Sequence, residues 1–470
     1  ELKKQQENQE KLVPNAQQRK FHLSSDEFLL EPPILRGHRI FGILSAFTKN
    51  PLKFITKINE TGHPIIKFKI GLKTGFIINE PSLIEYILEK NCNNYPKTLS
   101  LASVVNGGRL FKEKKQKIRK NLHFSRPTVA GKIKNSYIPI IARVTKSKLE
   151  VWSQYAETNT PLNMFEEITD LMIKISGETF LGLNIDIYAK EIVENINILR
   201  HFLETRLLQI IPRPIIFPTE NNIKFKQAKN RLNEILEEIL ADLEGTSKEN
   251  FVVNNLKQAI SKGDISLEEA KDHLFTMIIG GYETTAMATT CAIYLLASSK
   301  RVKEKLQTEV DEMFTDEIPT VQNLKDSLYL NMVFFEALRM YPPAWLMNRV
   351  ALKDDVINHV LIPANSLIIV SQYAMHHNPL YWENHADFNP ERFENYSKIK
   401  FGFKYFPFGG GMYSCVAEQF AKILVPEVIG LFVREFDFEM PDTFKFEITP
   451  SVALHPENGL QILLTKRNQR

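Results

Sequence analysis

The sequence predicts a mainly α-helical protein with a small β region, an α+β chain folded as one large domain. Helix-type spacing of apolar residues runs from about residue 112 to residue 345, whereas strand-type alternation is confined to short stretches. The 470 residues contain neither a Pro-, Ser- or Gly-rich linker nor a repeat of fixed period. These observations favour one domain over the about three that length alone suggests.

The composition is that of a soluble globular protein, with 43% hydrophobic and 24% charged residues. The net charge of +4 is mild and argues neither for nor against nucleic-acid binding. No stretch of about 20 apolar residues occurs, so no membrane-spanning helix is expected. Three widely spaced cysteines disfavour a disulfide framework and indicate a reducing compartment. We therefore expect a soluble, cytoplasmic chain; because residue 1 is Glu rather than Met, a removed leader or anchor stays open.

The N-terminal segment, residues 1–30, is expected to be a polar arm, because its beginning is rich in Lys and Gln. The single domain then spans residues 31–470. A capping-box pair, Ser82 with Glu85, predicts a helix over residues 83–89.

A β-hairpin is expected just before that helix. Ile66, Phe68 and Ile70 alternate with polar residues, and a glycine-bounded turn at 71–75 leads to a second strand at 76–78.

Four later elements complete the expected fold. We expect a long helix over about 266–296, short strands within 356–370 with a turn at 363–365, a helix over about 418–434 and a strand over 459–464.

A glycine-rich loop precedes one of the three cysteines: residues 406–415 read Phe-Pro-Phe-Gly-Gly-Gly-Met-Tyr-Ser-Cys. Cys415 has no Cys or His at zinc-ligand spacing and no protease-type signature. Axial ligation of a large planar cofactor remains, because glycines let backbone amides approach a sulfur and a flat ring closely. The alternative is a buried, inert cysteine after a glycine loop.

Two glycines interrupt the long helix at Gly280-Gly281-Tyr282-Glu283-Thr284-Thr285. Each costs about 1 kcal/mol relative to alanine, so a compensating role is expected. Thr284 can bond back to the preceding turn and open the helix slightly. The glycines could admit a bulky cofactor, or they could only mark the contact of two crossing helices.

Charged residues within apolar surroundings form a third pattern. Glu336 and Arg339 lie three residues apart, on one helix face, and their flanks are apolar. A buried pair needs further hydrogen bonds, and Arg392 is the candidate third member. The alternative is a solvated pair.

A basic run between Lys112 and Lys120 includes Lys115 and Arg119. Such a run is ordinarily a solvated face. The alternatives are contact with an anionic cofactor group or with an acidic partner protein.

The order and separation of these motifs resemble the haem-thiolate monooxygenases, the cytochrome P-450 family. The resemblance runs from about residue 50 to residue 465 and rests on a Gly-Gly-x-Glu-Thr-Thr helix, a Glu-x-x-Arg helix, a Pro-Glu-Arg-Phe turn and a Phe-x-x-Gly-x-x-x-Cys loop. It implies a single triangular, mostly helical domain that binds haem b.

The resemblance also implies roles around the cofactor. Cys415 would be the axial thiolate ligand of the haem iron, which favours O–O cleavage. Glu283 and Thr284 match the acid–alcohol pair that relays protons to dioxygen. Gly280 would lie over the haem face, and Phe408 and Gly409 would lie beside the sulfur.

Further residues would hold the haem in place. Glu336, Arg339 and Arg392 match the family's structural triad beneath the cofactor. Arg349 and Arg119 would reach the haem propionates.

Three residues depart from the family pattern. Tyr413 stands where the family has Arg or His, so it can donate only a neutral hydrogen bond to a propionate. Lys115 replaces Trp or His, and Ala417 replaces Gly where helix and haem meet. These departures concern haem affinity rather than fold.

The implied reaction inserts one oxygen atom from dioxygen into an apolar, lipid- or terpenoid-like substrate. Substrate-facing segments are expected at 99–110, 196–217 and 344–347. No flavin or nicotinamide fingerprint occurs, so electrons must come from a separate protein. The basic run, with Lys398, Lys400 and Lys404, suits an acidic ferredoxin or flavodoxin, or a reductase. We expect a monomer without a nucleic-acid partner.

Two other functions stay open. A haem-thiolate enzyme can rearrange peroxides without dioxygen, although such chemistry does not need Glu283 and Thr284. A degenerate member would bind haem or an apolar ligand without turnover, and Tyr413 and Ala417 are the residues that favour it.

Overall fold

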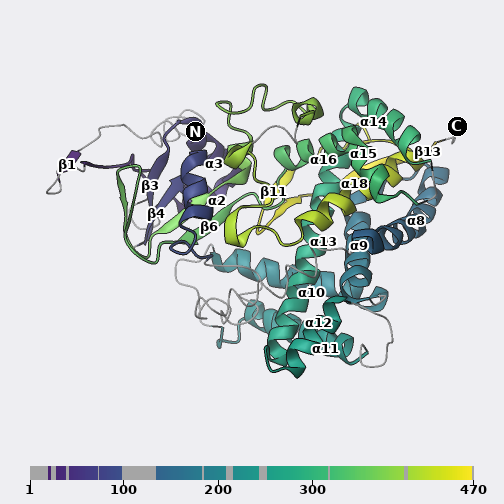
Figure 1. Cartoon of the computed structure of the whole chain (residues 1–470), viewed down its shortest axis with the longest axis horizontal. Coiled ribbons are helices and arrows are strands. Elements are labelled where there is room, and N and C mark those ends of the chain that lie inside the picture. Colours follow the sequence, from purple (N-terminus) through teal and green to yellow (C-terminus); the bar gives the residue numbers. More distant parts are fainter. Residues whose placement is uncertain are drawn as a thin grey trace.

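The protein is mostly helical; strands β3, β4 and β6 lie at one side of the molecule, and β13 lies at the other side, next to α8 (Figure 1). The protein is seen here in a computed structural model. The structure describes residues 20–22, 28–38, 42–71, 73–97, 134–182, 185–207, 215–242, 251–315, 318–395 and 401–467.

Helices make up most of the described chain. The α-helices are α2 (Leu44–Lys49), α3 (Pro51–Glu60), α4 (Pro81–Glu85), α8 (Lys134–Thr158), α9 (Met164–Ser176), α10 (Asp186–Leu207), α11 (Glu220–Asp242), α12 (Phe251–Ser261), α13 (Leu267–Ala297), α14 (Lys300–Met313), α15 (Val321–Asp326), α16 (Leu328–Met340), α17 (Gln372–His376) and α18 (Glu418–Glu435). Shorter turns are the π-helices η1 (Tyr86–Lys90) and η2 (Gly177–Leu181) and the 3-10 helices η3 (Pro390–Phe393), η4 (Gly402–Lys404) and η5 (Gly411–Tyr413). Among the described helices, none is long and apolar enough to cross a membrane.

The largest described sheet has four strands in the order β3-β4-β9-β6: β3 (Ile65–Ile70), β4 (Lys73–Ile78), β9 (Leu367–Val370) and β6 (Met347–Val350). β4 pairs with β9 in parallel, whereas the other two pairs are antiparallel. Segments far apart in sequence therefore meet in this sheet.

Smaller sheets complete the β region. They are β10-β13-β5 (Phe436–Glu439, Gln461–Lys466, Leu162–Asn163), β11-β12 (Ile448–Pro450, Leu454–Pro456), β7-β8 (Asp355–Ile357, Val360–Ile362) and β1-β2 (Lys20–His22, Phe28–Leu30).

Helix α13 is the central element of the helical part (Figure 1). It begins at a capping box in which the Ser266 hydroxyl accepts from the Glu269 N–H while the Glu269 carboxylate accepts from the Ser266 N–H. Most of its buried apolar residues belong to the main hydrophobic core, to which α8, α9, α16 and α18 also contribute. A methyl group on Gly281 would lie 2.8 Å from the Phe180 ring and from the Ser176 hydroxyl. Gly281 therefore lies at a close contact between helices, which was one of the two interpretations of this motif.

The expected N-terminal hairpin is confirmed as β3 and β4. The turn is shorter than predicted, because β4 already begins at Lys73. Gly75 belongs to the strand, where a side chain would collide with the Phe68 ring at 2.2 Å. Within residues 1–30, expected to be a polar arm, the structure describes β1 and β2 as an antiparallel pair.

The capping-box prediction at Ser82 is wrong. Pro81 occupies the first turn of α4, the N-cap is Glu80, and the Ser82 hydroxyl donates to the Glu80 carboxylate at 2.6 Å. The fixed φ of proline suits a helix start, so Pro81 sets the boundary two residues earlier than the capping signal suggested.

The other predicted elements are confirmed with small shifts at their ends. The long helix is α13, the helix after the cysteine is α18, and the last strand is β13. The strands expected within 356–370 divide between the β7-β8 hairpin and β9, with Asn365 at a positive φ of 65° in the turn between them. Strand β6 was not foreseen.

Candidate active site

The glycine-rich loop folds tightly against the N-terminal part of the chain. Gly409 and Gly411 have φ values of +74° and +65°, in the region that favours glycine. A methyl group on Gly411 would lie 1.8 Å from the Leu88 carbonyl oxygen, and one on Gly410 would lie 2.5 Å from the Phe403 ring. The glycines are therefore required by close packing, and they are not a flexible linker.

The loop turns back on itself at the cysteine. The Cys415 N–H donates to the Phe408 carbonyl oxygen at 2.8 Å. The Cys415 side chain is exposed, and its sulfur accepts a hydrogen bond from the N–H of Ala417. The protein atoms packed around the thiol raise its pKa, whereas the Ala417 N–H and the charge of Lys97 act in the opposite direction.

Two cations lie close to Cys415 around one aromatic ring. The Lys97 ammonium and the Arg349 guanidinium lie 5.6 Å and 5.4 Å from the centre of the Tyr413 ring. Neither cation contacts a carboxylate among the described residues. Arg349 is 2% exposed, and its Nε has no hydrogen-bond partner in the part of the chain that the structure describes.

Their surroundings disfavour both charges. Packed atoms around the Lys97 ammonium, followed by the nearby Arg349 charge, lower the pKa of Lys97 to about 8, although the side chain keeps some exposed surface. Burial lowers the pKa of Arg349 to about 10. Two cations in such surroundings, with no carboxylate partner in the part of the chain that the structure describes, are costly unless an anion binds between or beside them.

One face of α13 is open at the interrupted motif. Gly280 is exposed, and a methyl group there would meet no protein atom within 4 Å. The Thr284 hydroxyl, one turn later, donates to the Gly280 carbonyl oxygen at 3.0 Å. The open face at Gly280 distinguishes it from Gly281, which packs against α9.

The Glu283 side chain points away from the open face at Gly280 and Thr284, toward β12 and α10. Its Oε1 lies 3.1 Å from Nε2 of His455 on β12 and 3.5 Å from Nη1 of Arg200 on α10. These residues line a cavity of about 320 Å³ between α9, α10 and α13. His455 was not found from the sequence, because nothing in its local pattern marks it as a partner of α13.

Glu336, Arg339 and Arg392 are brought together. Glu336 and Arg339 are fully buried, and the guanidinium bonds both carboxylate oxygens, with Nε–Oε2 at 2.7 Å and Nη2–Oε1 at 2.8 Å. Nε of Arg392 lies 3.3 Å from the same Oε1. Arg339 also donates to the carbonyl oxygens of His376 and His385, each at 2.9 Å.

Comparison with known proteins identifies the family. The family model for cytochrome P-450 matches residues 32–463. The chain belongs to the cytochrome P-450 family.

Known relatives align with most of this cytochrome P-450, although their sequence identity to it is low. Protein LUTEIN DEFICIENT 5 of Arabidopsis thaliana is 26% identical over 431 residues, which cover 86% of this chain and 72% of that protein. Carotene epsilon-monooxygenase of the same plant is 23% identical, covering 87% and 81%. Mouse cytochrome P-450 3A41 is 26% identical, covering 84% and 83%. The chain is thus a cytochrome P-450 monooxygenase, and its family uses thiolate-ligated haem.

The residues around Cys415 fit such a haem. A haem carries two carboxylates, and Lys97 and Arg349 supply two cations that lack other counter-charges among the described residues. Gly280 leaves open space on α13, and Cys415 presents an accessible sulfur. Lys97 was missed in the sequence, where a single Lys after Tyr95 and Pro96 carries no motif. Arg119 and Lys115, with the basic run around them, lie outside the described residues.

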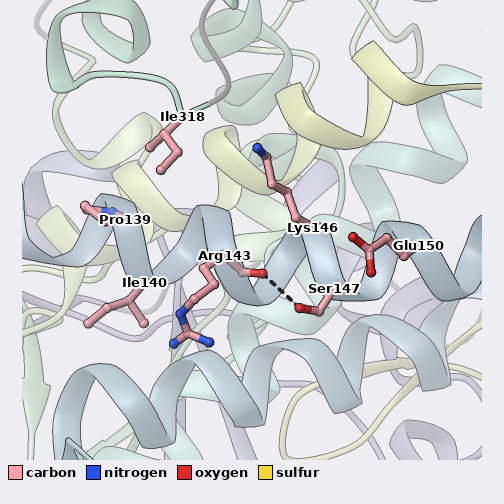
Figure 2. Close-up of a pocket in the computed structure, with 7 residues that line it drawn as sticks. All are labelled: Pro139, Ile140, Arg143, Lys146, Ser147, Glu150 and Ile318. Carbon is pink, nitrogen blue, oxygen red and sulfur yellow. Dashed lines mark hydrogen bonds between the residues drawn. The ribbon is translucent and has the colours of Figure 1, made fainter.

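Another hollow, of about 470 Å³, lies on the outer face of α8 (Figure 2). It is lined by Arg143, Lys146, Glu150 and Ile318 among others, and the Ser147 hydroxyl beside it donates to the Arg143 carbonyl oxygen at 3.2 Å. It contains none of the candidate residues.

Replacing Lys97 tests the fit with haem. We expect Lys97→Met to speed haem loss to an acceptor protein by about tenfold or more, because a hydrogen bond to a charged group contributes about 1.5–3 kcal/mol. Lys90→Met is the matched control, since Lys90 is exposed and pairs with Glu85 at 2.9 Å. Equal rates of loss in the Lys97 variant and wild type would mean that Lys97 does not contact the haem carboxylates.

Proposed function

We propose that this cytochrome P-450 inserts one oxygen atom from dioxygen into an apolar substrate, with Cys415 as the haem ligand. The observation that carries the proposal is the accessible Cys415 sulfur, bonded by the Ala417 N–H and accompanied by Lys97 and Arg349. When bound, the haem supplies the reductive activation of dioxygen.

In this proposal Cys415, Ala417 and the two cations would hold the cofactor. The Ala417 N–H, by donating to the sulfur, stabilises the thiolate over the thiol and so favours ligation. Lys97 and Arg349 would bind the two carboxylates, and both cations lie close to the neutral ring of Tyr413. Burial raises the pKa of Tyr413, so its hydroxyl stays protonated at neutral pH. An Arg at this position would add a third positive charge to the pair.

Thr284 and Glu283 supply protons in this proposal. The Thr284 hydroxyl lies on the open face of α13 and donates its proton to the Gly280 carbonyl oxygen; rotated away from that carbonyl, it would donate into the open space beside Gly280. Glu283, buried one residue earlier, lies beside the cavity that Arg200 and His455 also line. Rotation of the Glu283 side chain away from Arg200 and His455 would let its carboxyl group, once protonated from that cavity, pass the proton toward Thr284.

The substrate is proposed to be lipid- or terpenoid-like. Carotene, named for one Arabidopsis relative, is an apolar isoprenoid, which supports the terpenoid part of this class. The segment 344–347 remains a substrate-facing candidate, because Met347 lies beside Gly409 of the cysteine loop. The segment 99–110 lies outside the described residues.

The expectation for 196–217 needs correction over its described helical part. Ile196 and Phe202 are buried in the core, and the Phe202 ring stacks on Phe225 of α11 with centroids 4.0 Å apart. The apolar residues of α10 thus largely serve helix–helix packing. Ile216 and Phe217, beyond α10, are exposed.

Electrons are proposed to come from a separate acidic protein. Lys404 is exposed just before the cysteine loop, and Lys422 on α18 lies 5.6 Å from the Phe408 ring beside that loop. Opposite charge on a partner would steer it to this face and shorten the path to the haem. Lys398 and Lys400 lie outside the described residues.

A spectral titration of the haem-loaded protein tests the substrate class. We would add members of a panel of lipids and terpenoids and record the spin-state change that follows displacement of water from the iron. A saturable change with a terpenoid or lipid, followed by an oxygenated product, supports the proposal. Saturable binding without any product would instead favour a ligand-binding member without turnover.

Removing one hydroxyl tests the proton path. We expect Thr284→Ala to retain haem but to lower product formed per electron consumed, with the missing electrons appearing as hydrogen peroxide. Positioned acid–base groups contribute about 10²–10⁴-fold to rates, so the productive branch should fall strongly. The matched control is Thr308→Ala on α14, which removes a similar bond, from Thr308 Oγ1 to the Glu304 carbonyl at 3.1 Å. If Thr284→Ala forms as much product per electron consumed as wild type, Thr284 has no role in proton delivery and is only a helix-packing residue.

A further inference from the structure

A two-residue clamp on α17 holds the start of the cysteine loop. Gln372 and His376 lie four residues apart, so their side chains share one face of this short helix. The Phe406 N–H donates to His376 Nε2 at 3.0 Å, and Gln372 Nε2 donates to the Phe406 carbonyl oxygen at 2.7 Å. Both backbone polar groups of one residue are thereby satisfied by side chains of a single helix.

The clamp is fully internal. Gln372 and His376 are 1% and 0% exposed, and Phe406 is 5% exposed. A buried N–H or C=O left without a partner is destabilising, and no water can replace these partners without opening the packing. The position of Phe406 is therefore determined by α17.

The His376 ring can act only as an acceptor toward Phe406. The donor is a backbone N–H, so Nε2 must be unprotonated and the imidazole neutral. Burial, followed by the charges of His377 and Arg339, lowers the pKa of His376 well below its usual range, against a smaller opposing effect of the Leu338 and Arg339 carbonyls. The ring therefore stays neutral at physiological pH.

Short backbone connections link the clamp to the sulfur. The Phe406 carbonyl also accepts the Gly409 N–H at 2.9 Å, which closes the first turn of the loop. Two residues after Phe406, the Phe408 carbonyl accepts the Cys415 N–H. A displacement of Phe406 would thus move the groups that orient Cys415.

The other end of the clamp is fixed by the buried ion pair. Arg339, which bonds both oxygens of Glu336, donates from Nη1 to the His376 carbonyl oxygen at 2.9 Å. A continuous series of contacts therefore runs from Glu336 through Arg339 and His376 to Phe406.

We propose that His376 and Gln372 are positioning residues for Cys415, which set the place and hydrogen bonding of its sulfur by holding Phe406. The proposal rests on the ligand role of Cys415 proposed above. It assigns to α17 a function in tuning the thiolate, in addition to the packing of its side chains.

The test uses haem-loaded full-length protein and four variants. His376→Leu removes the acceptor, and Gln372→Met removes the donor at nearly constant volume. His376→Gln is the conservative rescue, because its amide oxygen can take the place of Nε2. Tyr405→Phe is the matched control: it removes a neighbouring buried bond, from the Tyr405 hydroxyl to the Phe335 carbonyl at 2.8 Å, without touching the polar groups of Phe406.

Three properties are measured on the same samples: the fraction of the red-shifted ferrous–carbon monoxide band, the haem reduction potential, and the exchange rate of the Phe406 amide resolved by fragmentation mass spectrometry. We expect His376→Leu and Gln372→Met to lower the red-shifted fraction about twofold or more and to shift the potential. In His376→Leu the Phe406 amide should exchange about tenfold faster, because its acceptor is gone. His376→Gln should resemble wild type in all three properties.

The outcomes separate this proposal from the one on which it rests. A wild-type protein without the red-shifted band overturns the ligand role of Cys415. With that band present, equal loss in Tyr405→Phe, or an unchanged Phe406 amide in His376→Leu, overturns the positioning role. If His376→Leu fails to bind haem, Gln372→Met and His376→Gln still decide: a wild-type spectrum and potential in Gln372→Met, or no rescue in His376→Gln, contradicts the proposal.

Discussion

Cys415→Ser should abolish the red-shifted ferrous–carbon monoxide band and product formation. Serine retains the size of the side chain and the backbone bond from residue 415 to Phe408, but an alkoxide is not formed at neutral pH. The electron-donating ligand is therefore lost while the loop can keep its fold. Absorbance spectra and product assays on the same preparation measure the two losses.

The other cysteines provide the controls. Cys291 is fully buried in α13, and burial raises the pKa of its thiol well above the usual range, so it cannot serve as a thiolate. Cys92 is half-buried near the end of η1. Cys291→Ala and Cys92→Ser should keep the red-shifted band. Survival of that band in Cys415→Ser, or its loss in either control, would refute the assignment.

Arg339→Met should destabilise the folded chain by about 3–5 kcal/mol, because it leaves the Glu336 carboxylate buried without its main counter-charge. The three carbonyl oxygens of His376, His385 and Asp387 also lose a donor. Urea-induced unfolding, followed by circular dichroism, measures the effect. Arg339→Lys keeps the positive charge but loses the two-pronged contact with Glu336. Its stability should therefore fall between that of wild type and that of Arg339→Met.

An exposed ion pair is the control for this prediction. Lys300 pairs with Glu304 at 3.7 Å on the surface of α14, where both side chains are largely solvated. Lys300→Met should change stability little, because exposed pairs contribute weakly. If Arg339→Met unfolds at nearly the same urea concentration as Lys300→Met, the buried pair is not a major source of stability.

Sequence patterns predicted the elements whose signals are local. Helix-type spacing locates α13 within one residue of its ends, and alternation locates β3. The glycines before Cys415 also signalled a close approach of backbone to other atoms, which the contact of Gly411 with Leu88 explains. The wrong prediction at Ser82 also concerns local signals. Ser82 and Pro81 each mark a possible helix start, and the helix follows the proline.

Site residues that depend on distant packing were not predictable in the same way. Lys97 becomes notable only because β6 brings Arg349 to it, and His455 only because the β11-β12 hairpin lies against α13 and α10. The apolar residues of α10 suggested a substrate surface, but several of them are buried in the protein core, as Phe202 is against Phe225 of α11. Hydrophobicity predicts burial, and it does not say whether the burying partner is protein or ligand.

The parallel pairing of β4 with β9 has a consequence for synthesis on the ribosome. Gly75 aligns with Leu367, so β4 emerges long before its partner strand exists. At about 5–20 residues per second, roughly 15 to 60 seconds separate the two strands. During that time one edge of the β3-β4 hairpin, with Phe76, Ile77 and Ile78, has no strand to pair with and is open to aggregation. Because the cysteine loop emerges later still, Cys415 can bind haem only after this edge has already been exposed for that time.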